Sequence, residues 1–328
     1  MVPDRRFCIA PMMGCTDRHE RYFLRLISGR AMLYTEMIPA AALLAGSPGR
    51  FLAHSAEESP VGLQVGGCDP EGLARCAELA EAAGFDEINI NVGCPSAKVQ
   101  SGRFGACLMA EPELVSTCIR QMVSHVRIPV TVKCRIGIDG HDRYEDLLVF
   151  VETLAASGCR TFHVHARKAW LNGLSPKQNR EVPPLNYETV YRLKAAHPEL
   201  EIIINGGIRS IDAAKSHLQA VDGVMVGREA YHNPFRFADI DRQLFGVAAA
   251  EPSRFEILDR YKVYIVEQLQ SGVRLKQMTR HILGLFHGQP GARAWRRCLS
   301  EHRVDGAAGL EVLERAEAAI RQQAQWAI

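Results

Sequence analysis

The chain has 328 residues, of which 47% are hydrophobic and 23% charged, and its formal net charge is +2. These values are typical of globular proteins and exclude the disordered, collagen-like and fibrous classes. No apolar run approaches the roughly 18–20 residues that a membrane span needs, and the N-terminal residues lack the apolar stretch of a signal peptide, so we expect a cytoplasmic protein without a membrane partner.

Short runs rich in apolar and β-branched residues recur as far as Val226, and each predicts a β-strand. The eight predicted strands are Phe7–Ala10, Ala31–Met37, Val61–Val65, Glu87–Val92, Pro129–Arg135, Thr161–His165, Glu201–Asn205 and Gly223–Val226. Helix-like stretches lie between them. Two of these stretches carry start signals, Asp69 before Pro70 in one and Pro112 in another.

Eight strands that alternate with helices predict parallel βα units, and eight is the number that closes a (β/α)8 TIM barrel, an α/β fold. An open doubly wound sheet is the alternative, but the chain has no G-x-G-x-x-G turn after the first strand. We therefore predict a catalytic barrel domain over residues 1–245. A long loop, residues 172–185, follows the sixth strand.

The pattern changes after Gly246, where the predicted strands stop. Residues 247–253 are typical of a linker, and apolar residues at helical spacing then predict an all-helical domain over residues 254–328. This domain holds 12 Lys and Arg against 8 Asp and Glu, and Arg274–Arg303 contains seven basic residues and one acid. The excess indicates a polyanionic partner, although a solvated helix face would show the same pattern.

Polar residues occupy alternate positions in several predicted strands, where their apolar neighbours face the helices. Ile88 and Ile90 thus turn Asn89 and Asn91 toward the barrel interior. The same alternation turns inward Gln64, Thr131, Lys133, Arg135, His163 and His165, and Asn205 ends the seventh strand. Most of these residues are near the carboxyl ends of their strands, where barrel enzymes build their active sites.

Glycines follow the seventh and eighth strands, in Asn205-Gly206-Gly207 and in Gly227-Arg228. Loops at these two positions form the usual phosphate site of barrels, because glycine lets backbone amides approach an anion. Arg228 adds a charged donor. We therefore predict a phosphate-bearing cofactor or substrate.

A metal site is a second interpretation of the H-x-H pair His163 and His165. No carboxylate or third histidine is evidently close in the sequence, and Lys133 and Arg135 would repel a cation. We expect no bound metal.

Ten cysteines are scattered along the chain without a C-x-x-C pair, so we expect neither a disulfide framework nor a structural zinc site. Cys94 differs from the others because it lies between a strand-end glycine and a proline, in a loop at the catalytic edge. This placement is typical of a general acid or a nucleophile. A buried loop cysteine would give the same pattern, and spacing leaves both interpretations open.

Motifs in family order from residue 10 to residue 228 resemble those of the tRNA-dihydrouridine synthases. They are Ala10–Met13, Leu63–Gly67, Asn91–Ser96, Phe104–Met109, Val132–Arg135, His163–Arg167, Asn205–Ile208 and Val226–Arg228. Further segments resemble the bacterial A subfamily: Thr16–His19, Leu33–Met37, Ala169–Lys177 and Asn179–Leu185. The resemblance covers the predicted barrel, and no motif position departs from it.

This resemblance implies an FMN-dependent oxidoreductase that uses NADPH to reduce the C5–C6 bond of uridines 20 and 20a in the tRNA D-loop. It implies that hydride passes from reduced FMN to C6 and that Cys94 gives a proton to C5. A thiol suits this role, because it is mostly protonated at neutral pH yet a stronger acid than a hydroxyl. The target base must leave the tRNA fold to reach the barrel.

The resemblance also implies two sets of binding residues. Those for FMN are Pro11, Met12, Met13, Gln64, Lys133, His165, Asn205, Gly206, Gly207, Gly227 and Arg228. Those for the uracil or the tRNA are Asn91, Lys177, Arg180, Arg293, Arg296 and Arg297. We expect no DNA partner and a monomeric protein.

Three alternatives remain at this point. One is a flavin barrel enzyme that reduces a free pyrimidine, as dihydroorotate and dihydropyrimidine dehydrogenases do, but it leaves the basic helical domain without a role. Another is an RNA-binding protein whose barrel has lost its activity, against which Cys94, Lys133 and His165 count. The third is the same chemistry at another D-loop position, as in the B or C subfamilies.

Overall fold

The computed structural model describes residues 3–46, 48–248, 250–301 and 309–325. Contacts divide the chain into two compact units, one from Met1–Gly14 and Ala31–Gly227 and the other from Cys15–Arg30 and Arg228–Ile328. We call them the first and the second unit. The expected domain boundary within residues 246–253 concerns independent folding and stays a prediction.

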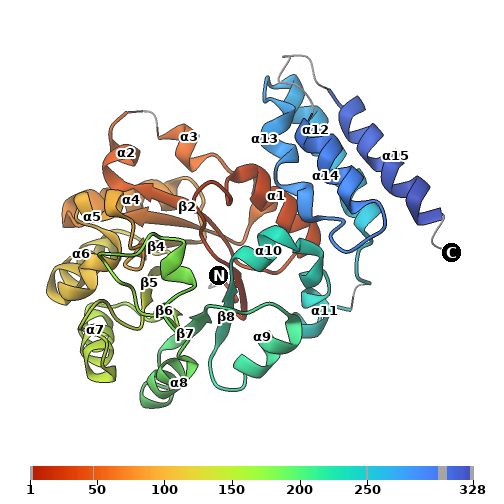
Figure 1. Ribbon diagram of the computed structural model, residues 1–328. Coiled ribbons are helices and arrows are strands. Elements are labelled where there is room, and N and C mark those ends of the chain that lie inside the picture. Colours follow the sequence, from red (N-terminus) through yellow and green to blue (C-terminus); the bar gives the residue numbers. More distant parts are fainter. Residues whose placement is uncertain (1–2, 47, 249, 302–308, 326–328) are drawn as a thin grey trace. The chain divides into compact units, whose positions relative to one another are not determined.

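The first unit contains eight parallel strands in the order β1-β8-β7-β6-β5-β4-β3-β2 (Figure 1). Their bounds are β1 Phe7–Ile9, β2 Leu33–Pro39, β3 Val61–Gly66, β4 Glu87–Asn91, β5 Val130–Arg135, β6 Thr161–His165, β7 Glu201–Asn205 and β8 Gly223–Val226. A parallel bridge between Cys8 and Met32 joins β1 to the start of β2. The predicted TIM barrel is therefore confirmed.

Helices of the first unit cover the outer face of the strands, as Figure 1 shows for α4, α6, α7 and α8. The helices are α2 Ala40–Leu44, α3 Gly49–Leu52, α4 Pro70–Ala82, α5 Ala97–Ser101, α6 Pro112–His125, α7 Tyr144–Ala156, α8 Tyr187–Ala196 and α9 Ile211–His217. Asp69 caps α4 by accepting a hydrogen bond from the Gly72 amide, and Pro70 and Pro112 are the first residues of α4 and α6, as predicted.

Strand register sets the height of each inward side chain within the barrel. Asn89 pairs with Gln64 on one side and with Thr131 on the other, and Asn91 pairs with Lys133. One step further, Arg135 pairs with His165. Because side chains alternate along each strand, these polar residues face the interior in successive layers, as predicted.

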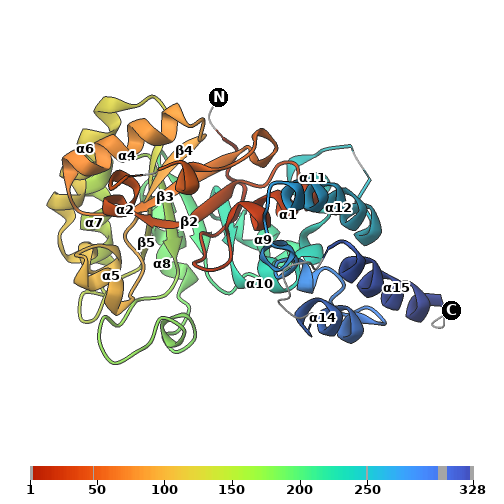
Figure 2. The ribbon, with the colours of Figure 1, turned by 90° about the horizontal axis from the view of Figure 1, so that it is seen from above.

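The second unit is helical in its described residues, which confirms the predicted helical tail in the ranges 254–301 and 309–325. Its helices are α1 Arg18–Ile27, α10 Arg228–His232, α11 Ile240–Phe245, α12 Arg254–Gln270, α13 Leu275–Thr279, α14 Ala292–Glu301 and α15 Glu311–Gln325. A capping box between Ser253 and Glu256 starts α12. Helices α14 and α15 lie side by side (Figure 2).

Aromatic side chains hold α1 against α12 within this unit. The Tyr22 and Tyr264 rings stack with centroids 4.0 Å apart, and the Tyr264 hydroxyl lies 2.7 Å from His19 Nδ1. Tyr261 is fully buried and packs against Phe23. Aromatic contacts of this kind stabilise beyond the area they bury, so α1 shares a core with helices that follow it by more than 220 residues.

None of the helices in the described ranges has both the length and the apolar character that crossing a membrane requires.

Candidate active site

Cys94 lies in the loop that follows β4, at the carboxyl end of the barrel. Its backbone amide donates to Asn91 Oδ1 at 2.9 Å, and its carbonyl accepts from the Ala106 amide at 2.9 Å. Gly105 has a φ of +81°, and a Cβ there would lie 2.5 Å from the Cys94 carbonyl oxygen. The motif that contains Gly105 thus holds the Cys94 loop because only glycine fits.

Arg135 fixes the same loop from the end of β5. Its side chain is 3% exposed. It donates to the carbonyls of Gly93 at 2.8 Å and of Lys168 and Asn179 at 3.1 Å. Burial lowers the pKa of Arg135 to about 10. The guanidinium therefore ties the loop after β4 to the loop after β6.

Lys133 lies one layer below Arg135 on the same strand. Burial lowers the pKa of Lys133 to about 8, and the neighbouring positive charge of Arg135 adds to the effect. The ammonium donates to Asn205 Oδ1 at 3.1 Å, and Asn205 Nδ2 donates to the Met225 carbonyl at 2.7 Å. Among the described residues, no carboxylate forms an ion pair with Lys133 or Arg135. The site therefore carries uncompensated positive charge.

His165 and the glycines after β7 lie together. Burial and the nearby cations hold the pKa of His165 well below its usual value, so its imidazole is neutral at pH 7. Gly206 has a φ of +125°, and a Cβ there would lie 2.9 Å from the His165 ring. Gly207 also has a positive φ, at +71°.

The end of β1 meets the end of β8 at Gly227. A Cβ at Gly227 would make ordinary contacts, 3.5 Å from Met12 Sδ and 3.6 Å from Ala10. Protein atoms therefore do not demand glycine at this position. Pro11 and Met12 are partly exposed, whereas Met13 is 63% exposed. Arg228 is the first residue of α10 and belongs to the second unit.

The loop after β6 is organised by the buried Asn179. Its side chain accepts from the Trp170 amide at 2.8 Å and donates to the Trp170 carbonyl at 2.9 Å and the Leu174 carbonyl at 3.3 Å. Lys177 and Arg180 flank this anchor and are exposed. The long predicted loop is confirmed, and a 3-10 turn, η3 Gln178–Arg180, lies within it.

The predicted arginines of the second unit lie on α14. Arg293, Arg296 and Arg297 line a cavity of about 860 Å³ together with His287 and Gln323. Trp295, between them in sequence, is fully buried, and its Nε1 donates to the Ile282 carbonyl at 3.1 Å. Trp295 therefore anchors the helix in the core while the arginines face the cavity. Arg303, the last residue of the predicted basic segment, lies outside the described residues.

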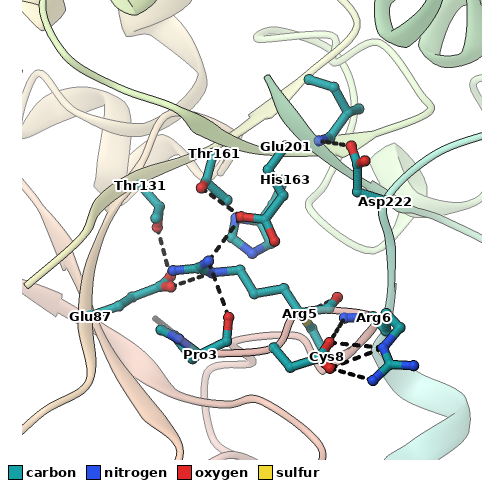
Figure 3. A network of polar contacts seen from close by, with 12 residues as sticks. Pro3, Arg5, Arg6, Cys8, Glu87, Thr131, Thr161, His163, Glu201 and Asp222 are labelled. Carbon is teal, nitrogen blue, oxygen red and sulfur yellow. Dashed lines mark hydrogen bonds and ion pairs between the residues drawn. The ribbon is translucent and has the colours of Figure 1, made fainter. Parts of the chain in front are cut away.

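Sequence reasoning missed two kinds of residue that shape this site. Arg135 binds carbonyls 33 and 44 residues away, and Asn179 binds carbonyls of its own loop without a regular period, so neither role has a recognisable sequence signal. Glu87, by contrast, begins the alternation that continues with Asn89 and Asn91, and this alternation places it inward. Figure 3 shows Glu87 paired with Arg5.

His163 is buried below the site, where its Nε2 lies 2.8 Å from the Tyr34 hydroxyl. Burial holds the pKa of His163 well below its usual value. Within the described ranges, no cluster of three His, Cys, Asp or Glu side chains has the arrangement of a metal site.

A family model for dihydrouridine synthases matches residues 8–324. Since this match spans nearly the whole sequence, the chain belongs to the dihydrouridine synthase family.

Its relatives include three bacterial proteins named tRNA-dihydrouridine(20/20a) synthase. The protein of Shewanella oneidensis is 57% identical over 95% of this chain and 92% of its own length. That of a Synechocystis strain is 56% identical over 94% of this chain and 92% of its own. That of Escherichia coli K12 is 55% identical over 95% of this chain and 90% of its own.

Among solved structures, a 2-naphthoyl-CoA reductase matches 73% of this chain and 50% of its own, with a TM-score of 0.55 and 10% identity. At this identity the likeness supports the barrel fold alone.

Proposed function

We propose that this protein is an FMN-dependent tRNA-dihydrouridine synthase that reduces uridines 20 and 20a of the tRNA D-loop, with NADPH as the reductant. The observation that carries the proposal is the identity of 55–57% with proteins named for this activity, over at least 90% of each chain. We further propose that it works as a monomer in the cytoplasm.

The residues at the carboxyl end of the barrel fit FMN. An electron-rich flavin edge needs a cation, and Lys133 has no carboxylate partner among the described residues. A flat ring system needs an apolar cover, and Met13 is an exposed methionine at this end. The ribityl phosphate needs hydrogen-bond donors and a glycine backbone that it can approach closely. Gly227 leaves such room, Gly206 and Gly207 follow β7 with positive φ angles, and His165 has one N–H to donate.

The remaining predicted FMN contacts are Pro11, Met12, Gln64, Asn205 and Arg228. Gln64 is only 1% exposed, and both ends of its amide already bond to asparagines. Its second amide hydrogen and the second lone pair of its oxygen are what it can still offer. When bound, FMN would supply hydride transfer to C6 of the uracil ring.

Cys94 would hold the proton that C5 of the uracil receives. Three contacts fix its loop: the amide bond to Asn91, the Arg135 bond to Gly93, and the Ala106 bond to the Cys94 carbonyl. Cys94 is partly exposed, so the uracil ring of the substrate can reach its thiol. Fixed geometry of this kind favours proton transfer because little reorientation remains to be done.

Asn91 can contact the uracil only as a donor. Its Oδ1 accepts from the Gly93 and Cys94 amides, and one hydrogen of Nδ2 binds Gln64. The second hydrogen is left for a carbonyl oxygen of the base. Asn91 would therefore recognise a pyrimidine carbonyl.

The tRNA backbone would be bound by two sets of basic residues, all of them exposed except the half-buried Arg296. Lys177 and Arg180 are held by the Asn179 anchor, and Arg293, Arg296 and Arg297 line the α14 cavity. Arginine and lysine contacts to phosphates supply affinity and orientation rather than base identity.

The test is to incubate the purified protein with FMN, NADPH and unmodified tRNA transcripts, and to locate dihydrouridine by mass spectrometry of nuclease fragments. We expect the product at positions 20 and 20a. Product at another D-loop position would refute the assigned position, and reduction of free uracil or orotate at comparable rates would refute the tRNA specificity.

A further inference from the structure

A chain of hydrogen bonds leads from the Cys94 loop into the barrel interior. The Cys94 amide donates to Asn91 Oδ1 at 2.9 Å, and Asn91 Nδ2 donates to Gln64 Oε1 at 2.9 Å. Gln64 Nε2 donates to Asn89 Oδ1 at 2.7 Å. Three buried primary amides on two neighbouring strands thus connect in series.

The chain ends on a carboxylate. Asn89 Nδ2 donates to Thr131 Oγ1 at 2.8 Å, and the Thr131 hydroxyl donates to Glu87 Oε1 at 2.7 Å. We call Asn91, Gln64, Asn89 and Thr131 the amide relay. Asn91 is 8% exposed and the other three are at most 1% exposed, so water does not compete for these bonds.

Both ends of the amide relay define its direction. An amide side chain has nearly the same shape with its oxygen and nitrogen exchanged, so its partners decide which way it points. A backbone N–H can only donate, which requires the oxygen of Asn91 to face Cys94. A carboxylate such as that of Glu87 can only accept. Each residue of the relay must therefore donate to the next one in the direction of Glu87. The two requirements agree along the whole relay.

Glu87 is itself held in place at the opposite end of the barrel from Cys94. Arg5 Nε donates to Glu87 Oε2 at 2.6 Å, and Arg5 NH1 reaches Glu201 at 2.8 Å (Figure 3). Arg5 is 2% exposed and Glu87 fully buried. Buried charges persist only when paired and hydrogen-bonded, so the Arg5 guanidinium secures the acceptor on which the relay ends.

We propose that Glu87 is a positioning residue, which acts through the amide relay to orient Asn91 and the Cys94 backbone. Without its fixed acceptor, Asn89 and Gln64 lose the bond that sets their direction, so the Asn91 side chain is oriented from the Cys94 end alone and its bond to the Cys94 amide weakens. The effect on catalysis rests on the proton-transfer role proposed for Cys94. The expected change in the hydrogen bond of the Cys94 amide does not depend on that role.

The decisive variant is Thr131→Val, which removes the hydroxyl between Glu87 and Asn89 and keeps the shape of the side chain. Thr131→Ser keeps the hydroxyl and serves as the rescue. Thr161→Val is the matched control, because the Thr161 hydroxyl donates to Glu201 Oε2 at 2.8 Å. It thus binds the other carboxylate partner of Arg5 from the neighbouring strand β6, outside the relay. Thr131→Ala replaces Thr131→Val if the valine variant does not fold.

The first measurement is the NMR spectrum of the full chain labelled with 15N at its ten cysteines. The Cys94 amide signal is the one lost in Cys94→Ala. We expect it to move upfield in Thr131→Val, because its hydrogen bond to Asn91 weakens, and to stay in place in Thr131→Ser and Thr161→Val.

The second measurement is dihydrouridine formation in tRNA. We expect kcat to fall by roughly 10- to 100-fold in Thr131→Val, the cost of a misplaced reacting group, with KM for tRNA unchanged. Thr131→Ser and Thr161→Val should retain wild-type kcat.

An unmoved Cys94 signal in Thr131→Val would overturn the proposal, as would Thr161→Val reproducing the effects of Thr131→Val. Full turnover by Cys94→Ala would instead refute the catalytic role of Cys94 and would leave the amide shift as evidence for the relay.

Discussion

Two cations, Lys133 and Arg135, lie at the mouth of the barrel without a carboxylate partner among the described residues. Burial lowers the pKa of Lys133 to about 8 and that of Arg135 to about 10. The Arg135 guanidinium donates hydrogen bonds to three backbone carbonyls and remains charged at neutral pH. Of the two, Lys133 has the pKa closer to neutral pH, so an anion bound beside it would couple its binding to the protonation of Lys133.

FMN affinity should therefore depend on pH through Lys133. Below about pH 8 the ammonium is already charged in the free protein, and affinity should be constant. Above that value, binding must take up a proton, so affinity should fall by up to roughly tenfold per pH unit. Fluorescence titration of FMN between about pH 6.5 and 9.5 measures this slope. A flat profile in the wild-type protein would contradict the assignment, and Lys133→Met should give weaker binding without the slope.

Replacing Cys94 by alanine should separate chemistry from binding. We expect dihydrouridine formation to fall by roughly 10²- to 10⁴-fold, the usual contribution of a general acid, with FMN still bound. Cys107→Ala is the control. Burial raises the pKa of the Cys107 thiol, which donates to the Phe104 carbonyl at 3.3 Å, so this variant should keep most activity. Equal losses in both variants would show that the effect is structural.

At the scale of elements, the alternation of side chains predicted the inward face of the strands, and the predicted ends of β6, β7 and β8 are confirmed, whereas those of the other strands differ by one or two residues. The second strand, expected over Ala31–Met37, occupies Leu33–Pro39. This strand contains a register shift between Tyr34 and Met37, and an irregular strand breaks the two-residue period from which the prediction was made. Such shifts arise from pairing with a neighbouring strand and leave no clear local signal.

The loop after β6 depends on one amide, and Asn179→Ala tests this dependence. Removing the side chain leaves the Trp170 amide and carbonyl without their partners, which should lower the free energy of unfolding by about 1–3 kcal/mol. Because Lys177 and Arg180 flank the anchor, tRNA affinity should fall as it does in the double variant Lys177→Ala/Arg180→Ala. Thermal unfolding and tRNA titration measure the two effects. Unchanged affinity in Asn179→Ala would show that the loop does not bind tRNA.

At the scale of the molecule, charge and core are segregated within the second unit. Trp295 and Leu299 bury one face of α14, while its arginines line a cavity of about 860 Å³. A helix that anchors one face can present the other to a polyanion without losing stability.

Arg296→Ala in the full-length protein should weaken tRNA binding by about 1–3 kcal/mol. It should also reduce the slope of log affinity against log salt by about one contact, because fewer counterions are released. Arg260→Ala removes an exposed arginine of α12 that does not line the cavity and should change neither quantity. Identical slopes for wild type and Arg296→Ala would exclude a phosphate contact at this residue.

The sequence by itself determined the barrel, its eight strands and the inward set of polar residues, because strand alternation is a local period that any window of the chain displays. Only the tertiary structure decided how these residues connect. Arg5 finds Glu87 across 82 residues, and the direction of the relay follows from which acceptor closes it. The packing of α1 on α12 is equally long-range. The Arg5–Glu87 pair depends on strand register and barrel closure and the helix pair on side-chain packing, and both arise only when distant segments meet, so no single segment encodes them.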